Sequence, residues 1–129
     1  MGSQVLFESS DRGAYSPIVR AGPFIFLSGQ LPVDPSSGLV VGKDIESQTR
    51  QVIANVDRLL RSADASLASI VCLTAYLSDI SQWDSFNTVY RSLMPSPFPT
   101  RTTIGVQLHG ALLELTVIAY RAQRQRKKA

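Results

Sequence analysis

Residues 44–63 read DIESQTRQVIANVDRLLRSA, and residues 70–77 read IVCLTAYL. In the first stretch, apolar side chains recur at three- and four-residue spacing with charged side chains between them, which is typical of an amphipathic helix that begins after Asp44. The second stretch is continuously apolar and rich in β-branched residues, as in a buried strand. We therefore expect a helix that packs one face on a sheet.

The residues before this helix predict short strands joined by turns. Turn-forming residues fill 11–17 and 34–38. Strands are expected at Val5–Phe7, Ile18–Arg20 and Phe24–Ser28, with 39–41 returning as a hairpin partner.

The residues after it predict a second helix and further strands. Ser81 is the expected N-cap of a helix whose apolar stripe runs from Trp83 to Leu93. Prolines at 95, 97 and 99 end that helix, and strands are expected at 102–106 and 112–120.

The resulting order, β-β-β-α-β-α-β-β, predicts an α+β sandwich. Two helices are expected on one face of a mixed or mostly antiparallel sheet. The predicted strands are apolar on both sides, so the other face also needs cover. Association of subunits is the simplest way to provide it.

The length of 129 residues fits one domain, 1–129. The tail, 121–129, carries five basic residues. The rest of the chain has 8 basic and 10 acidic residues, so it is mildly acidic. We expect this tail to be frayed and solvated. Contact with nucleic acid or an anionic membrane is the alternative, and it is less favoured because no aromatic residue interleaves the bases.

Several classes of protein are excluded by what the sequence lacks. A single cysteine, Cys72, excludes an internal disulfide and multi-cysteine metal sites, and its apolar neighbours predict a buried thiol. There is no secretory signal and no run long enough to span a membrane, so a soluble, cytoplasmic protein is expected. Nucleotide-binding glycine loops and zinc-ligand spacings are also absent, so neither a metal nor a cofactor is expected.

Two charged residues are candidates for chemistry. Arg101 follows the stiff segment 97–100 at the start of a strand, and a guanidinium can clamp a carboxylate through two parallel hydrogen bonds. By spacing alone, a surface arginine is the favoured interpretation. Glu114 lies among apolar residues, where a carboxylate is costly unless it is paired. It is either a functional carboxylate on a partly buried face or an outward-facing side chain.

Weaker candidates surround these two. Ser28 and Gly29 end a buried strand, where a glycine lets backbone amides approach a ligand. Tyr15 either closes over a pocket or packs on the surface. Asn87 either contacts a ligand or braces a loop. His109 has no base or metal partner nearby in sequence, so a structural or exposed role is expected.

Five motifs in a shared order resemble one family. They are GAYSP at 13–17, FLSGQLPV at 26–33, NTVY at 87–90, PFPTRTT at 97–103 and LELTVIA at 113–119. They are similar to those of the Rid proteins, which are reactive intermediate deaminases, also called the YjgF family and formerly labelled endoribonuclease L-PSP. The resemblance runs from about residue 13 to residue 120.

The resemblance implies a chorismate-mutase-like fold assembled as a homotrimeric barrel with active sites between subunits. It also implies hydrolysis of reactive enamines and imines, such as 2-aminoacrylate or 2-iminopropanoate, to 2-keto acids and ammonia without a cofactor. By the same resemblance, Arg101 binds the substrate carboxylate and Glu114 positions or activates water. Tyr15, Ser28 and Asn87 match pocket positions; Gly29 and Thr103 match positions of backbone contact.

One departure from the best-known branch concerns the substrate. Thr103 stands where that branch often has cysteine, and Thr-Arg-Thr-Thr at 100–103 also looks like 2-aminomuconate deaminases of the same superfamily. A larger amine of that kind, or a biosynthetic role, is therefore the alternative. An endoribonuclease and a non-enzymatic ligand-binding protein are less favoured.

Overall fold

The structure is a computed structural model that describes residues 2–7 and 13–123. Its elements follow the predicted order, with two short 3₁₀ turns, Leu67–Ser69 and Ile80–Gln82, added. They are β1 (Gln4–Phe7), β2 (Ile18–Ala21), β3 (Phe24–Leu27), α1 (Ile45–Ser62), β4 (Ile70–Leu77), α2 (Trp83–Leu93), β5 (Thr100–Gly105) and β6 (Leu113–Tyr120).

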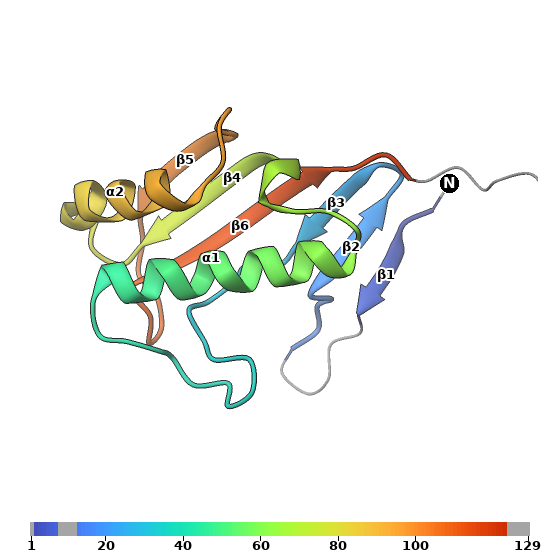
Figure 1. The fold of residues 1–129 in the computed structure, drawn as a ribbon. Helices are drawn as coiled ribbons and strands as arrows, with labels where there is room; N and C mark the ends of the chain where they lie inside the picture. The colour runs from blue at the N-terminus through green and yellow to red at the C-terminus, as the bar shows by residue number, and fades with distance from the viewer. Residues whose placement is uncertain (1, 8–12, 124–129) are drawn as a thin grey trace, which may run out of the picture.

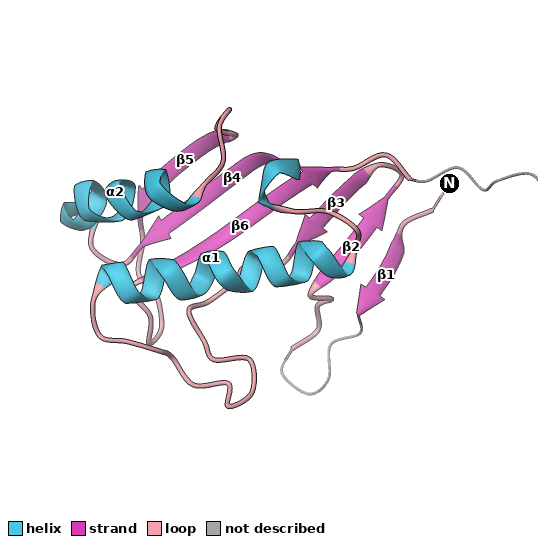
Figure 2. Ribbon diagram, viewed as in Figure 1, coloured by secondary structure: helices cyan, strands magenta, loops and turns pink. Residues whose placement is uncertain are grey.

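The strands form one sheet in the order β1-β2-β3-β6-β4-β5. All neighbours are antiparallel except β4 and β5, which run parallel because α2 crosses over between them. Both helices cover the same face of the sheet (Figures 1 and 2). The predicted α+β arrangement with a mixed sheet is therefore confirmed.

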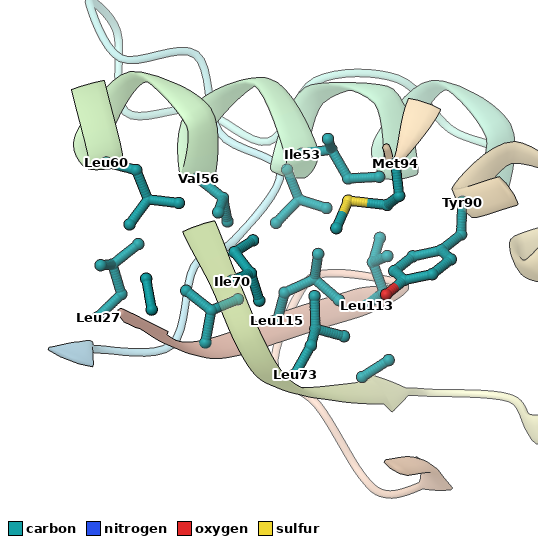
Figure 3. Close-up of a cluster of buried hydrophobic side chains, with 14 of the residues drawn as sticks. Leu27, Ile53, Val56, Leu60, Ile70, Leu73, Tyr90, Met94, Leu113 and Leu115 are labelled. Atoms are coloured by element: carbon teal, nitrogen blue, oxygen red, sulfur yellow. The ribbon is translucent and has the colours of Figure 1, made fainter. Parts of the chain in front are cut away.

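The core lies between the helices and this face. Alternate residues of β6 point toward the helices, and Leu113 and Leu115 are at most 1% exposed. Val56 and Leu60 of α1 meet them from the other layer, and Tyr90 of α2 reaches into the same cluster (Figure 3). This packing fixes which side chains of each strand remain on the other face.

The start of the second helix differs from the prediction. Ser81 is not its N-cap, because the turn Ile80–Gln82 precedes the helix and places the N-cap at Gln82, which makes no side-chain capping hydrogen bond. Asp79 caps that turn by accepting hydrogen bonds from Ser81 N at 2.9 Å and Ser81 Oγ at 2.7 Å. Asp44 caps α1 as expected, accepting from Ser47 N at 2.7 Å.

One other boundary in the prediction is also wrong. The strand expected at 102–106 begins at Thr100, because parallel pairing with β4 starts at Thr100 opposite Cys72. The segment 39–41 does return antiparallel as predicted, through the bridge of Val40 with Val33. Of the expected loop at 11–17, residues 13–17 form no helix or strand, and the first two lie outside the described residues.

Cys72 is exposed rather than buried. A bulge between Ile70 and Cys72 shifts the pairing with β6, and the Cys72 side chain lies on the face away from the helices. We call this side of the sheet the open face. A buried thiol was expected because the run 70–77 is apolar on both sides, and apolarity alone does not say which side faces the core.

The open face is rich in large apolar side chains. Phe24, Phe26 and Tyr120 are 42%, 41% and 50% exposed and form a chain of ring contacts. Ile104 of β5, which pairs with Tyr76 of β4, is 40% exposed on the same face. The two-sided apolarity predicted from the sequence is confirmed.

No helix in the described part of the chain is long and apolar enough to cross a membrane. The first residue of the basic tail is not frayed as predicted: the Arg121 N–H donates to the Pro23 carbonyl oxygen at 2.7 Å, and Arg121 Nε donates to the Asp64 carbonyl oxygen at 3.0 Å. From 124 onward the tail lies outside the described residues, so its predicted fraying there stays a prediction.

Candidate active site

Arg101 is held in an aromatic cage on the helix side of the sheet. Its side chain faces α2 because Arg101 pairs with Leu73, which points into the core. Its guanidinium carbon lies 5.2, 5.4 and 4.7 Å from the ring centroids of Trp83, Phe86 and Tyr90. These faces attract a cation and limit its motion. The guanidinium is therefore presented in a defined place.

Asn87 completes this arrangement. Its Oδ1 accepts a hydrogen bond of 2.9 Å from Arg101 Nη1. The bond is to a side chain of β5 and not to a loop, and Asn87 also lines the hollow beside Arg101, so its contact with a ligand stays a prediction. The guanidinium has five N–H donors, so most stay available to a ligand. In the described part of the chain, Arg101 makes no ion pair.

The cage also affects Tyr90. Burial raises the pKa of the Tyr90 hydroxyl, and the positive charge of Arg101 opposes that shift. The phenol therefore stays neutral at neutral pH. Tyr90 thus contributes an apolar ring and no charge to the surroundings of Arg101.

Glu114 belongs to a different cluster. It pairs with Tyr76 in the register of β6 on β4 and lies on the open face, opposite Leu113 and Leu115. A hollow there is lined by Tyr15, Ser28, Gly29, Leu31 and Glu114. This hollow collects four of the residues predicted from the sequence.

The Glu114 carboxylate depends on the absence of a side chain at position 29. A Cβ atom on Gly29 would lie 2.8 Å from Glu114 Cδ and closer still to Oε2. Gly29 therefore leaves the space that the carboxylate fills. In the described residues, Glu114 makes no ion pair, so its oxygens are available to a ligand or water.

Ser28 holds the loop that carries Tyr15. Its hydroxyl donates a 2.6 Å hydrogen bond to the Ser16 carbonyl oxygen, and its N–H donates to the Pro17 carbonyl oxygen at 3.0 Å. Tyr15, 53% exposed, lies at the rim of the hollow. Its ring is positioned by the backbone of this loop.

Thr103 lies on the edge strand β5, two residues beyond Arg101. It faces the helix side because it pairs with Ala75. Its Oγ1 is buried and has no hydrogen-bond partner within the described chain. The side chain is thus directed inward, and the backbone of an edge strand is the part that can meet a ligand.

The predicted site residues therefore form two half-sites on opposite faces of the same sheet. We call Arg101 with Asn87 the cation half, and Glu114 with Gly29, Ser28 and Tyr15 the carboxylate half. A single chain does not bring the two together. This separation is the main feature that the sequence did not reveal.

The aromatic cage was missed as a functional element. Trp83, Phe86 and Tyr90 were taken only as the apolar stripe of a helix. Their spacing also puts Asn87 beside them on the surface that β5 meets. A polar residue inside an aromatic stripe was the available signal.

The described residues contain no group of three or more histidine, cysteine, aspartate or glutamate side chains that could hold a metal. His109 is exposed in the turn before β6, as one of the two expectations had it.

Comparison with known proteins gives a consistent family. The model of the family described as Endoribonuclease L-PSP matches residues 8–121. A RutC family protein from Pyrococcus horikoshii is 37% identical, over 84% of this chain and 88% of its own.

A chloroplastic protein of Arabidopsis thaliana, Reactive Intermediate Deaminase A, is 35% identical over 73% of this chain and 50% of its own. Because that relative is chloroplastic, a cytoplasmic location stays a prediction for this chain. A crystal structure of a conserved Rid family protein from Yersinia pestis superposes with a TM-score of 0.85 at 34% identity, covering 92% of this chain and 99% of that one. The chain therefore belongs to the Endoribonuclease L-PSP family, whose members include the Rid and RutC proteins to which it is similar.

Proposed function

We propose that this protein hydrolyses reactive imines and enamines of the 2-iminopropanoate and 2-aminoacrylate type to 2-keto acids and ammonia. The observation that supports it is a caged guanidinium and a carboxylate that both lack ionic partners within the described chain. The first suits the carboxylate of a small substrate, and the second suits a water molecule. The deaminase named among the relatives agrees with this class of reaction.

In the proposed reaction, Arg101 binds the substrate carboxylate while Asn87 keeps the guanidinium in place. Glu114 accepts a hydrogen bond from water and directs its oxygen at the imine carbon. A carbon–oxygen bond forms, the electron pair of the C=N bond moves to nitrogen, and Glu114 passes a proton from water to that nitrogen. Glu114 then takes the proton of the new hydroxyl group, the oxygen's electron pair forms the C=O bond as the carbon–nitrogen bond breaks, and the keto acid and ammonia leave. Most of the rate gain comes from orientation, because a protonated imine is already electrophilic.

The active site is proposed to form between copies of the chain. Arg101 and Glu114 lie on opposite faces of one sheet, so one copy's cation half must meet another copy's carboxylate half. A ring of three copies, as in the family that the sequence resembles, satisfies this with three equivalent sites. The apolar open face provides surface for such contacts.

The test of activity uses imines made in place by an amino-acid oxidase acting on alanine, with keto-acid formation followed over time. We expect the wild type to accelerate it, and Glu114→Gln to lower kcat by about 10²-fold or more. Arg101→Ala should raise KM. Glu46→Gln is the matched control, because Glu46 is an exposed glutamate of α1 paired with Arg50. No acceleration with imines of several amino acids would refute the proposed reaction.

The test of shared sites mixes two inactive variants. Arg101→Ala chains keep the carboxylate half, and Glu114→Gln chains keep the cation half. If sites form between copies, an equal mixture refolded together regains about a quarter of wild-type activity, because that fraction of random interfaces has both intact halves. A mixture as inactive as its components would contradict shared sites.

A further inference from the structure

A hollow beside Arg101 contains a second arginine. It is an open space of about 340 Å³ lined by Asn87, Tyr90, Arg91, Phe98, Pro99 and Arg101. Among the residues that the structure describes, no acidic side chain lines it. The hollow therefore carries two positive charges where binding one carboxylate needs only one.

Arg91 is placed by the same helix that braces Arg101. It follows Asn87 by four residues on α2, so the two side chains neighbour each other on one helix face. Asn87 Oδ1 is bonded to Arg101 Nη1 at 2.9 Å. The Arg91 guanidinium carbon lies 5.7 Å from the centroid of the Phe98 ring. The second cation is thus held against the wall of the hollow, about one helical turn from the group that holds the first.

The charge of Arg91 is not neutralised inside the described chain. Arg50 and Arg61 each pair with an acid four residues earlier, Glu46 and Asp57. The residue four positions before Arg91 is Asn87, and Arg91 makes no ion pair in the described chain. The same helical spacing that satisfies other arginines therefore leaves this one free for an anion from outside.

We infer that Arg91 is a specificity residue that binds a second carboxylate, so that the preferred substrates are imines of dicarboxylic amino acids. Arg101 holds the carboxylate beside the imine carbon, and Arg91 holds the distal one. Phe98 and Pro99 give an apolar wall for the methylene groups between them. The shortest substrates of this class have four or five carbons and are 2-iminosuccinate and 2-iminoglutarate. This inference rests on the proposed function and names its substrate class.

The experiment compares two imines and several variants. 2-Iminoglutarate and 2-iminopropanoate are generated by oxidases acting on glutamate and alanine, and kcat/KM is measured for each. We expect the wild type to prefer 2-iminoglutarate by about tenfold or more, which is the effect of one charge-assisted contact. Arg91→Ala should abolish this preference through KM while leaving 2-iminopropanoate within about twofold. Arg91→Lys should keep part of the preference for 2-iminoglutarate. Arg50→Ala, which removes an exposed arginine outside the hollow, should keep all of it.

A binding measurement separates this inference from the proposed function. Calorimetry is used to compare 2-oxoglutarate with 2-oxobutanoate, which differ by the distal carboxylate. Tighter binding of 2-oxoglutarate by the wild type and its loss in Arg91→Ala support the inference even if no imine is hydrolysed. Equal binding of the two acids, or a preference that survives Arg91→Ala, overturns it even if 2-iminopropanoate is a good substrate. Unchanged thermal unfolding of Arg91→Ala shows that the variant is folded.

Discussion

At the scale of single residues, the contact between Gly29 and Glu114 makes the sharpest prediction. Gly29 does not have a positive φ, so its backbone accepts alanine. The added Cβ would lie 2.8 Å from Glu114 Cδ, and the carboxylate must move. We expect Gly29→Ala to lower kcat toward imines by about 10²-fold, because a shift of this size misplaces the attacking water.

The measurements must distinguish displacement of the Glu114 carboxylate from unfolding of the Gly29→Ala protein. Thermal unfolding and circular dichroism of Gly29→Ala should match the wild type. KM should change little, because in the proposed shared site the substrate carboxylate is bound by Arg101 of a neighbouring copy and not by the displaced Glu114. Wild-type kcat in Gly29→Ala would show that the position of the carboxylate does not matter.

The sequence predicted which charged residues are candidates for chemistry, but not where they lie relative to each other. Arg101 and Glu114 were identified because a stiff proline segment precedes one and an apolar strand surrounds the other. Their resemblance to family motifs supplied the roles, which stay proposals. Their placement on opposite faces could not be predicted, because it depends on the register of β5 and β6 against β4, and no local pattern fixes that register.

At the scale of elements, the first turn of α1 depends on a charged cap. Asp44 accepts hydrogen bonds from Ser47 N and Oγ, both at 2.7 Å. These bonds lower the pKa of the Asp44 carboxyl below its usual 3.8. A carboxyl with a lowered folded-state pKa adds stability that is fully present above the unfolded pKa and is lost as pH falls through the folded one.

We therefore expect Asp44→Ala to lower the free energy of unfolding at pH 7 and to do so much less at about pH 2. Urea unfolding of both proteins at the two pH values measures the difference. The similar carboxyls of Asp34 and Asp79 are present in both proteins, so their effects cancel. If Asp44→Ala lowers the free energy of unfolding by the same amount at both pH values, the charge of Asp44 does not contribute to the cap.

A second element-scale prediction concerns Asn55, which is 1% exposed in the middle of α1. Its Nδ2 donates to the carbonyl oxygens of Leu31 and Val33 at 3.1 and 2.8 Å. Asn55→Ala leaves both carbonyls without this donor and should lower the free energy of unfolding by about 1–3 kcal/mol. Arg58→Ala, which removes only a donor to Asn55 Oδ1, should cost less in the same urea titration. If the two variants lost equal free energy of unfolding, the two hydrogen bonds from Asn55 to the carbonyl oxygens would not be the source of the stability.

The elements themselves were predicted better than their ends. The apolar period of 44–63 and the β-branched run of 70–77 identified α1 and β4. The extra turn at Ile80–Gln82 displaced the expected cap at Ser81, and parallel pairing extended β5 back to Thr100. The start of β5 depends on pairing with β4, a contact distant in sequence, whereas the turn before α2 is held by the local cap Asp79.

At the scale of the whole molecule, the open face makes a prediction about assembly. Phe26 is 41% exposed there and packs near Phe24 outside the core beneath the helices. Phe26→Glu should leave the fold intact, reduce the sedimenting mass to that of one chain, and remove activity, because burying an unpaired carboxylate between copies is costly. Analytical ultracentrifugation measures the sedimenting mass, circular dichroism reports on the fold, and the imine assay measures activity.

The matched control for the open face is Leu39→Glu, which makes the same kind of change at a loop residue that is 70% exposed. It should change neither mass nor activity. An associated, active Phe26→Glu protein would show that the open face is not the contact surface.

The placement of Arg101 and Glu114 on opposite faces also has a consequence for inheritance. In a ring of three copies with shared sites, each chain contributes to two sites, so a copy that has lost both halves inactivates two of the three sites in the ring. A cell that makes such a copy alongside the normal one would retain about a quarter of full activity at equal expression, rather than half. A doubly substituted allele should therefore act as a dominant one, while Arg101→Ala alone should reduce activity only in proportion to its dose.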